Sequence, residues 1–174
     1  MRARTVPVRE IHGPVRQTVD VNKPFEWIVD WDENVRFLHE AKLVLVCRRI
    51  RLEDNPATSH THPVSGTTSS SESQHTHSVA NHTHPLQYGI FEGSYPTTRN
   101  IGLMINGVDV TAALGGPWNP AENTPLVLDI TQYLQEPDGR PKQQRNRLRI
   151  SAGALLDVEV QLKSLIAIAT VVPV

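Results

Sequence analysis

The chain has 174 residues, a formal charge of −1 and one cysteine. This near-neutral charge gives no field that favours nucleic acid or an anionic membrane, and a single cysteine excludes an internal disulfide. The length suffices for one domain with a core, or for one domain with an extension. No apolar stretch of signal-peptide length follows Met1 and no run reaches membrane-spanning length, so we expect a chain made in a cytoplasm without a membrane span. Many β-branched residues and 13 prolines favour an all-β protein.

Residues 1–22 are predicted to form an N-terminal arm or attachment segment. Residues 5–8 and 15–21 have the composition of short strands, but Pro7 and Pro14 lack the N–H that an inner strand needs. They therefore indicate edge strands or an extended arm that docks onto another protein. The alternative is a partly ordered tail.

Residues 23–54 are predicted to be the first part of a β-sandwich. Residues 25–30 follow a strand pattern, with the apolar side chains at 25, 27 and 29 on one face. Residues 31–40 are expected to contain a short helical turn, because Val35, Leu38 and His39 have helical spacing. A long strand follows over residues 41–52, in which Cys47 is expected to be a small core residue and not a nucleophile.

Residues 55–86 are predicted to be an excursion from the sandwich. Residues 57–85 consist mainly of Ser, Thr, His, Gly and Asn and lack large apolar side chains, so they cannot bury a core of their own. Because strand patterns flank the segment on both sides, it must leave the sandwich and return. Its tip is expected near residues 65–73, where serines cluster.

Residues 87–174 are predicted to complete the sandwich. Strand patterns occupy residues 101–105, 126–130, 147–150, 156–163 and 166–172, and Asn106-Gly107 is a strong hairpin signal. Seven or more short strands separated by turns indicate a sandwich. Residues 165–172 are apolar on both faces. Since a chain end is seldom central in a small sandwich, we expect this strand to lie against another subunit.

A His-Thr-His tripeptide occurs three times within residues 60–84 and accounts for six of the 8 histidines. In an extended strand, side chains two positions apart point to one face, about 6–7 Å from each other. Each copy therefore presents two imidazoles that can chelate a divalent metal when neutral. Three identical chains around a threefold axis would supply six nitrogens, a closed octahedral cage. The predicted ligands are His60, His62, His75, His77, His82 and His84.

A metal would also explain how so polar a segment is ordered. Ordering costs roughly 1–2 kcal/mol per residue, apolar burial supplies little here, and metal-binding free energy acts directly as folding free energy. The alternatives are a solvated loop or a tract that binds zinc loosely. In a plain hairpin, residues 61 and 76 would lie at one height, where the axis has room for one metal. His60 and His62 are therefore the pair least expected to bind it.

These repeats, followed by Tyr88-Gly89-Ile90, resemble the tail-fibre and tail-tip receptor-binding proteins of bacteriophages. Residues 41–51 and 109–117 are similar to the segments before and after such repeats in tailed-phage minor structural proteins. The resemblance implies a virion location in the phage tail and a short needle in which HxH pairs from three chains coordinate iron octahedrally. Nickel and zinc also suit imidazole. The implied partners are other tail proteins and a host cell-surface receptor, either glycan or protein.

A second resemblance covers residues 101–162 and looks like a galactose-binding-type jelly roll. The segments that carry it are residues 105–107, 115–116, 128–134 and 146–150. It implies a jelly-roll-like sandwich more safely than it implies sugar binding. Within it, Asp129 or Thr131 is expected to cap a short turn whose Tyr133 and Leu134 pack inward.

The favoured hypothesis is therefore a homotrimeric structural protein of a phage tail that contacts the host surface. The alternative is a carbohydrate-binding module with a His-rich loop. Trp118 and Asn119 are candidates for a glycan or subunit contact, although the favoured interpretation of Trp118 is a side chain that covers the end of the sandwich. No enzyme is expected and no catalytic residue is assigned, because nucleophile elbows, Ser/His/Asp sets and phosphate loops are absent from the sequence. A six-His octahedral site also leaves no open coordination position for catalysis.

Overall fold

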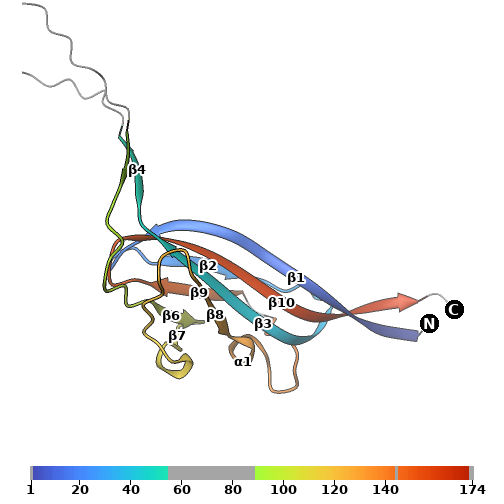
Figure 1. Cartoon of the computed structure of the whole chain (residues 1–174). Helices are drawn as coiled ribbons and strands as arrows, with labels where there is room; N and C mark the ends of the chain where they lie inside the picture. Colours follow the sequence, from blue (N-terminus) through green and yellow to red (C-terminus); the bar gives the residue numbers. More distant parts are fainter. Residues whose placement is uncertain (1, 55–88, 144, 173–174) are drawn as a thin grey trace, which may run out of the picture. The chain divides into compact units, whose positions relative to one another are not determined.

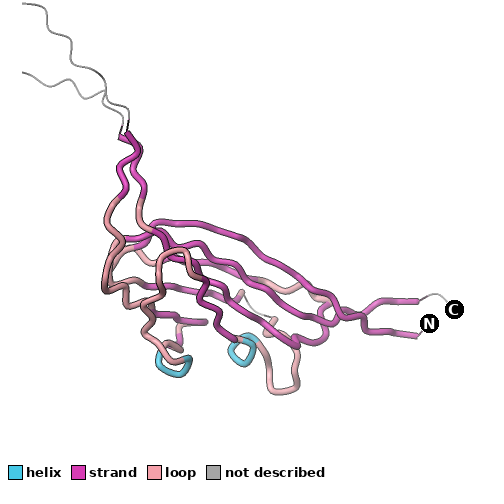
Figure 2. Tube along the Cα trace, in the orientation of Figure 1, coloured by secondary structure: helices cyan, strands magenta, loops and turns pink. Residues whose placement is uncertain are grey.

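The computed structural model describes residues 2–54, 89–143 and 145–172. Strands dominate these ranges (Figure 2). The strands are β1 (Arg2–Val19), β2 (Phe25–Val29), β3 (Val35–Arg48), β4 (Arg51–Asp54), β5 (Gly89–Glu92), β6 (Gly102–Ile105), β7 (Val108–Asp109), β8 (Pro125–Asp129), β9 (Asn146–Ser151) and β10 (Leu156–Val172). Two short helical elements, η1 (Ala112–Leu114) and α1 (Thr131–Leu134), accompany them. Within the described ranges, no helix has the length and apolar character of a membrane span.

The first sheet contains β1, β10, β3 and β8 in that order, all antiparallel. Figure 1 shows β10 running between β1 and β3. Ile166 and Ala167 of β10 point to opposite faces, and both are buried, at 2% and 5% exposure. The premise that a chain end would not be central is therefore wrong, because β1 pairs along β10 and closes the sheet outside it. The single chain alone therefore buries both faces of β10 at Ile166 and Ala167, without a second subunit.

The N-terminal region forms one strand where the sequence suggested two. A bulge between His12 and Val15 takes up Gly13 and Pro14 without ending the pairing with β10. Gly13 has a φ of +88°, and a Cβ there would lie 2.8 Å from the carbonyl oxygen of Val160, so the bulge requires glycine. The strand lies at the edge of its sheet, as the two prolines predicted.

The second sheet contains β2, β9, β6 and β7, also antiparallel. Its tightest connection is the predicted hairpin between β6 and β7. Asn106 and Gly107 have φ of 53° and 82°, the pair of positive angles that a two-residue type I′ turn requires. The sequence signal and the observed turn agree.

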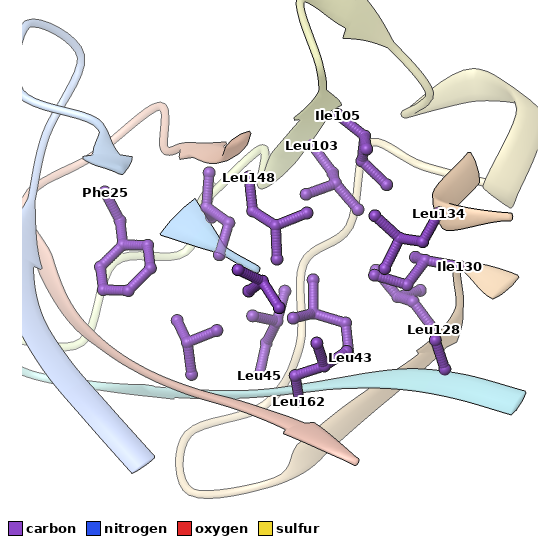
Figure 3. Packing of buried hydrophobic residues seen from close by; sticks show 14 of the residues in the cluster. Phe25, Leu43, Leu45, Leu103, Ile105, Leu128, Ile130, Leu134, Leu148 and Leu162 are labelled. Carbon is purple, nitrogen blue, oxygen red and sulfur yellow. The ribbon is translucent and has the colours of Figure 1, made fainter. Parts of the chain in front are cut away.

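The core lies between the two sheets. Figure 3 shows side chains of both sheets pointing toward one another, among them Leu43 and Leu45 of β3 and Leu148 of β9. These three and Ile150 are 0% exposed. Full burial of each such side chain contributes about 1.5–3 kcal/mol, so this layer is the main source of stability. An all-β sandwich is confirmed.

The predicted helical turn over residues 31–40 is wrong, because β3 already begins at Val35. Two register shifts occur here. Leu165 of β10 pairs with Glu40, but the next residue of β10 pairs with Leu38, which leaves His39 as an extra residue. A second shift follows between Ala167 and Ile168. These bulges place Val35 and Leu38 on the core side at a spacing of three, which imitates a helix.

Residues Arg51–Glu92 form a compact unit of their own, distinct from Met1–Ile50 and Gly93–Val174. Its described part is an antiparallel pair in which β4 and β5 align Arg51 with Glu92 and Asp54 with Gly89. An ion pair of 2.8 Å joins the side chains of Arg51 and Glu92. The predicted excursion, residues 55–86, falls within this unit, which also includes neighbouring residues that the sequence pattern places in the sandwich.

Candidate functional site

The six predicted metal ligands lie in the range 55–88, outside the described residues. Among the residues that are described, no group of three or more His, Cys, Asp or Glu could hold a metal ion. The described residues closest to this segment are those where the chain leaves the sandwich and where it returns. These two places are defined by Ile50 and Gly93.

Ile50 and Gly93 are joined by a backbone hydrogen bond. The amide of Gly93 donates to the carbonyl of Ile50 over 3.0 Å. A Cβ at position 93 would lie 2.9 Å from Cγ1 of Ile50, so the close approach favours glycine. The chain that leaves the sandwich and the chain that returns are thus bonded to each other at its boundary.

The leaving chain is held by Arg49. Its Nε and Nη2 donate to the two carboxylate oxygens of Glu122 over 2.7 and 2.6 Å, and its backbone amide donates to the same carboxylate over 3.1 Å. The Glu122 side chain is only 19% exposed. A bidentate, partly buried pair of this kind is stronger and more directional than an ordinary surface ion pair.

The returning chain is held by Tyr95 and Arg99. The Tyr95 hydroxyl donates to the carbonyl of Pro120 over 2.9 Å, and Nη2 of Arg99 donates to the carbonyl of Asn119 over 2.6 Å. The Arg99 guanidinium also lies 4.9 Å from the centre of the Tyr95 ring, within cation–π range. The two hydrogen-bond acceptors, the carbonyls of Pro120 and Asn119, belong to the same short segment that contains Glu122.

We call Arg49, Tyr95, Arg99 and the segment 119–122 the root clamp. One segment of the sandwich thereby holds both ends of the His-bearing excursion. Such an arrangement fixes the positions at which the chain leaves the sandwich and returns to it.

Cys47 lies beneath the root clamp and is fully buried, as the sequence predicted. Burial raises the pKa of its thiol to about 11 and that of the Tyr95 hydroxyl to about 12. The carbonyl of Cys47 accepts a hydrogen bond of 2.9 Å from the amide of Asn123. A thiol held neutral at physiological pH is a poor nucleophile.

Trp118 and Asn119, the candidates for a glycan or subunit contact, are both engaged within the chain. Trp118 exchanges backbone hydrogen bonds with Ile101, of 2.8 and 3.1 Å, and its half-buried ring packs against the core. The side-chain oxygen of Asn119 accepts the amides of Arg99 and Asn100 over 2.7 and 3.1 Å. This placement fits the interpretation in which Trp118 covers the end of the sandwich.

The root clamp could not be found from the sequence. Arg49 and Glu122 are 73 positions apart, and neither stands in a recognisable motif. The one available signal was topological: a polar excursion between two strands needs an anchor at each end. Comparison with models of known protein families, with curated proteins and with solved structures gave no match.

Proposed function

We propose that this chain is a non-catalytic structural protein of a tailed bacteriophage, a homotrimeric tail-fibre or tail-tip component. Its His-bearing segment would form a short metal-stabilised needle that contacts the host surface. The observation that carries the proposal is the combination of three His-Thr-His pairs with a segment whose two ends are paired and anchored at one place. A solvated linker would need neither.

The energetics of the segment support a metal. Residues 57–85 offer almost no apolar surface, so hydrophobic burial cannot offset an ordering cost of about 1–2 kcal/mol per residue. Metal binding to neutral imidazoles supplies folding free energy directly. Iron is favoured by the resemblance to phage proteins, and nickel and zinc fit the same ligands. Each ion would take two nitrogens from each of three chains.

The root clamp supports a mechanical role. A needle that meets a surface would transmit force to its base, and here residues 119–122 bind both the leaving and the returning chain. The carbohydrate-binding alternative is less well supported, because the half-buried Trp118 packs against the core and the Asn119 side-chain oxygen accepts two backbone amides of the same chain. A jelly-roll order of the strands stays part of the proposal and adds no sugar specificity.

The proposal is tested by metal content and mass on the full chain. We expect a trimer at neutral pH that contains up to three transition-metal ions. Because a ligating imidazole must be neutral and its ordinary pKa is about 6.5, metal should be lost as the pH falls below about 5, or with a strong chelator. Elemental analysis and light scattering measure both quantities. Protein purified without chelator that contains no transition metal would refute the proposal.

A pair of variants makes the test specific to the repeats. Replacing His75 and His77 together by alanine should lower the metal content by about one ion per trimer. Replacing His12 and His39, which lie outside the repeats, is the matched control and should leave it unchanged. Equal metal content in both double variants would show that the metal is bound elsewhere.

A further inference from the structure

The outer face of the second sheet carries a row of arginines. Arg145, Arg147 and Arg149 occupy alternate positions of the chain, and the last two belong to β9. Asn146 and Leu148 between them are buried, so the alternation of the strand turns Arg147 and Arg149 to solvent, about 7 Å apart. β9 lies between β2 and β6, which places these two arginines in the interior of the face and not at its edge (Figure 1).

A hollow of about 110 Å³ is formed on this face. Arg147 and Arg149 line it together with Glu26, Met104 and Gly107. The strand register brings these residues together, because Arg149 pairs with Glu26 of β2 on one side and with Met104 of β6 on the other. A Cβ added at Gly107 would meet no atom within 4 Å, so that end of the hollow is open. The volume is smaller than that of pockets that enclose a whole ligand and suits one small group.

The charges that line the hollow are unequal. Two guanidinium groups face one carboxylate, that of Glu26, whose Oε1 lies 3.9 Å from Nε of Arg149, too far for a hydrogen bond. In the part of the chain that the structure describes, neither Arg147 nor Arg149 has a hydrogen-bond acceptor for its guanidinium. The nearby carboxylate of Asp30 lies 3.7 Å from Arg145 and does not line the hollow. The hollow therefore combines one net positive charge with guanidinium donors that can still bind an anion.

The chemistry of these three charged groups favours a phosphate monoester. A guanidinium presents a planar fork that binds carboxylate or phosphate through two hydrogen bonds. A carboxylate has two oxygens and fills one fork, whereas a phosphate monoester has three free oxygens and a charge of about −1.5 to −2 at pH 7, so it can accept from both. Glu26 repels a bare anion but accepts a hydrogen bond from a neutral hydroxyl next to the phosphate. An ammonium group in that place would be repelled by both arginines.

We propose that this hollow binds the phosphate group of a phosphorylated sugar. Arg147 and Arg149 would donate to the phosphate oxygens, and Glu26 would accept from a sugar hydroxyl. Ile28, which pairs with Arg147 and is 43% exposed, would contact the C–H groups of the sugar. All of these residues belong to the sandwich unit, so the proposal does not depend on the needle, the metal or the trimer.

The test titrates the full chain with glucose 1-phosphate, inorganic phosphate and phosphoethanolamine by calorimetry at about pH 7.5. We expect saturable binding of glucose 1-phosphate with a dissociation constant on the order of 1 mM, as for a small group in an open site. Inorganic phosphate and phosphoethanolamine should bind at least about five-fold more weakly, since neither brings a hydroxyl to Glu26. Equal affinities for glucose 1-phosphate and inorganic phosphate, or tighter binding of phosphoethanolamine, would overturn the proposal.

Variants locate the binding and separate its two parts. Arg147→Gln should weaken binding of glucose 1-phosphate about ten-fold, and Arg147→Lys, which keeps the charge without the fork, should weaken it a few-fold. Arg36→Gln, at an exposed arginine of β3, is the matched control and should change nothing. Glu26→Ala should abolish the preference for glucose 1-phosphate over inorganic phosphate, because it removes the hydroxyl acceptor and the repulsion together. Equal losses in Arg147→Gln and Arg36→Gln, or an unchanged preference in Glu26→Ala, would overturn the proposal.

Discussion

Within the root clamp, the carboxylate of Glu122 holds the leaving chain by accepting three hydrogen bonds from Arg49. Glu122→Gln keeps the shape of the side chain but removes its charge. We expect the free energy of unfolding to fall by about 1–2 kcal/mol, the range for charge-assisted hydrogen bonds that are partly buried. Urea unfolding measures the loss, and faster hydrogen exchange at the Gly93 amide would localise it to the root.

The matched control for Glu122 is Asp138, which pairs with Arg140 at 3.1 Å where the two side chains are 56% and 69% exposed. Asp138→Asn should change stability by less than about 0.5 kcal/mol, because water screens the pair. Similar losses in both variants would show that the Arg49–Glu122 pair is no more than a surface ion pair.

Thr131 connects α1 to the sheet and does not cap the helix, whose N-cap position is Ile130 and has no side-chain cap hydrogen bond. Its hydroxyl accepts the amide of Ala41 over 2.8 Å and donates to Asp129 over 2.6 Å, and its own amide donates to Asp129 over 3.0 Å. These two hydrogen bonds from Thr131 lower the pKa of Asp129 below its ordinary value of 3.8. Leu134 is fully buried, as expected, whereas Tyr133 is half-buried.

Thr131→Val should therefore lower stability in a pH-dependent way. At pH 7 we expect a loss of about 1–3 kcal/mol, because the amide of Ala41 loses its acceptor and Asp129 loses a donor. The folded-state pKa of Asp129 is depressed, so its contribution is complete above about pH 4 and disappears as the pH falls through that pKa. Urea unfolding at pH 7 and below pH 3 should show a smaller difference between variant and wild type in acid. A constant difference would exclude Asp129 from the effect.

The strands themselves could be predicted wherever alternation is regular. The sequence indicated β2, β6, β8 and β9 nearly to their limits because each buries every second residue or ends in a recognisable turn. It failed at the start of β3, where bulges replace alternation by a spacing of three. It also divided β1 and β10 into shorter strands, since Pro14 and the change from alternating to continuous apolar sequence both resemble strand ends. A bulge is a shift in register against a partner strand that is distant in the sequence, so a local sequence pattern does not reveal it.

The bulge in β1 can be tested at Gly13. Gly13→Ala must adopt a positive φ and also bring a methyl group to 2.8 Å from the carbonyl oxygen of Val160. Gly107 has a similar φ of 82° but no atom within 4 Å of the added methyl, so Gly107→Ala isolates the backbone cost of about 1–2 kcal/mol. We expect a larger loss for Gly13→Ala, about 2–4 kcal/mol in thermal or urea unfolding. Equal losses would mean that the bulge relaxes around the methyl group.

One part of the candidate site can be predicted from residue spacing in the sequence, and the other part is assembled only by the fold. The His-Thr-His pairs are readable because both ligands of a pair lie two residues apart and the pattern repeats three times. The root clamp is not readable, because its residues come from three separate parts of the chain and each is an ordinary polar or aromatic residue.

The separation of the molecule into two units gives a final prediction. Among the residues whose burial the structure describes, the buried apolar cluster lies outside Arg51–Glu92, so we expect the sandwich to fold without the excursion. Asp54 and Gly89 are direct partners in the β4–β5 pair, which a two-residue Asn-Gly turn can close in place of residues 55–88. We expect this variant to unfold within about 3 °C of the wild-type midpoint, to bind no metal and to have the mass of a single chain. Calorimetry and light scattering measure these properties. A variant that stays trimeric would place the subunit contacts on the sandwich, and one that fails to fold would show that the excursion contributes to the core, because nothing else distinguishes the two proteins.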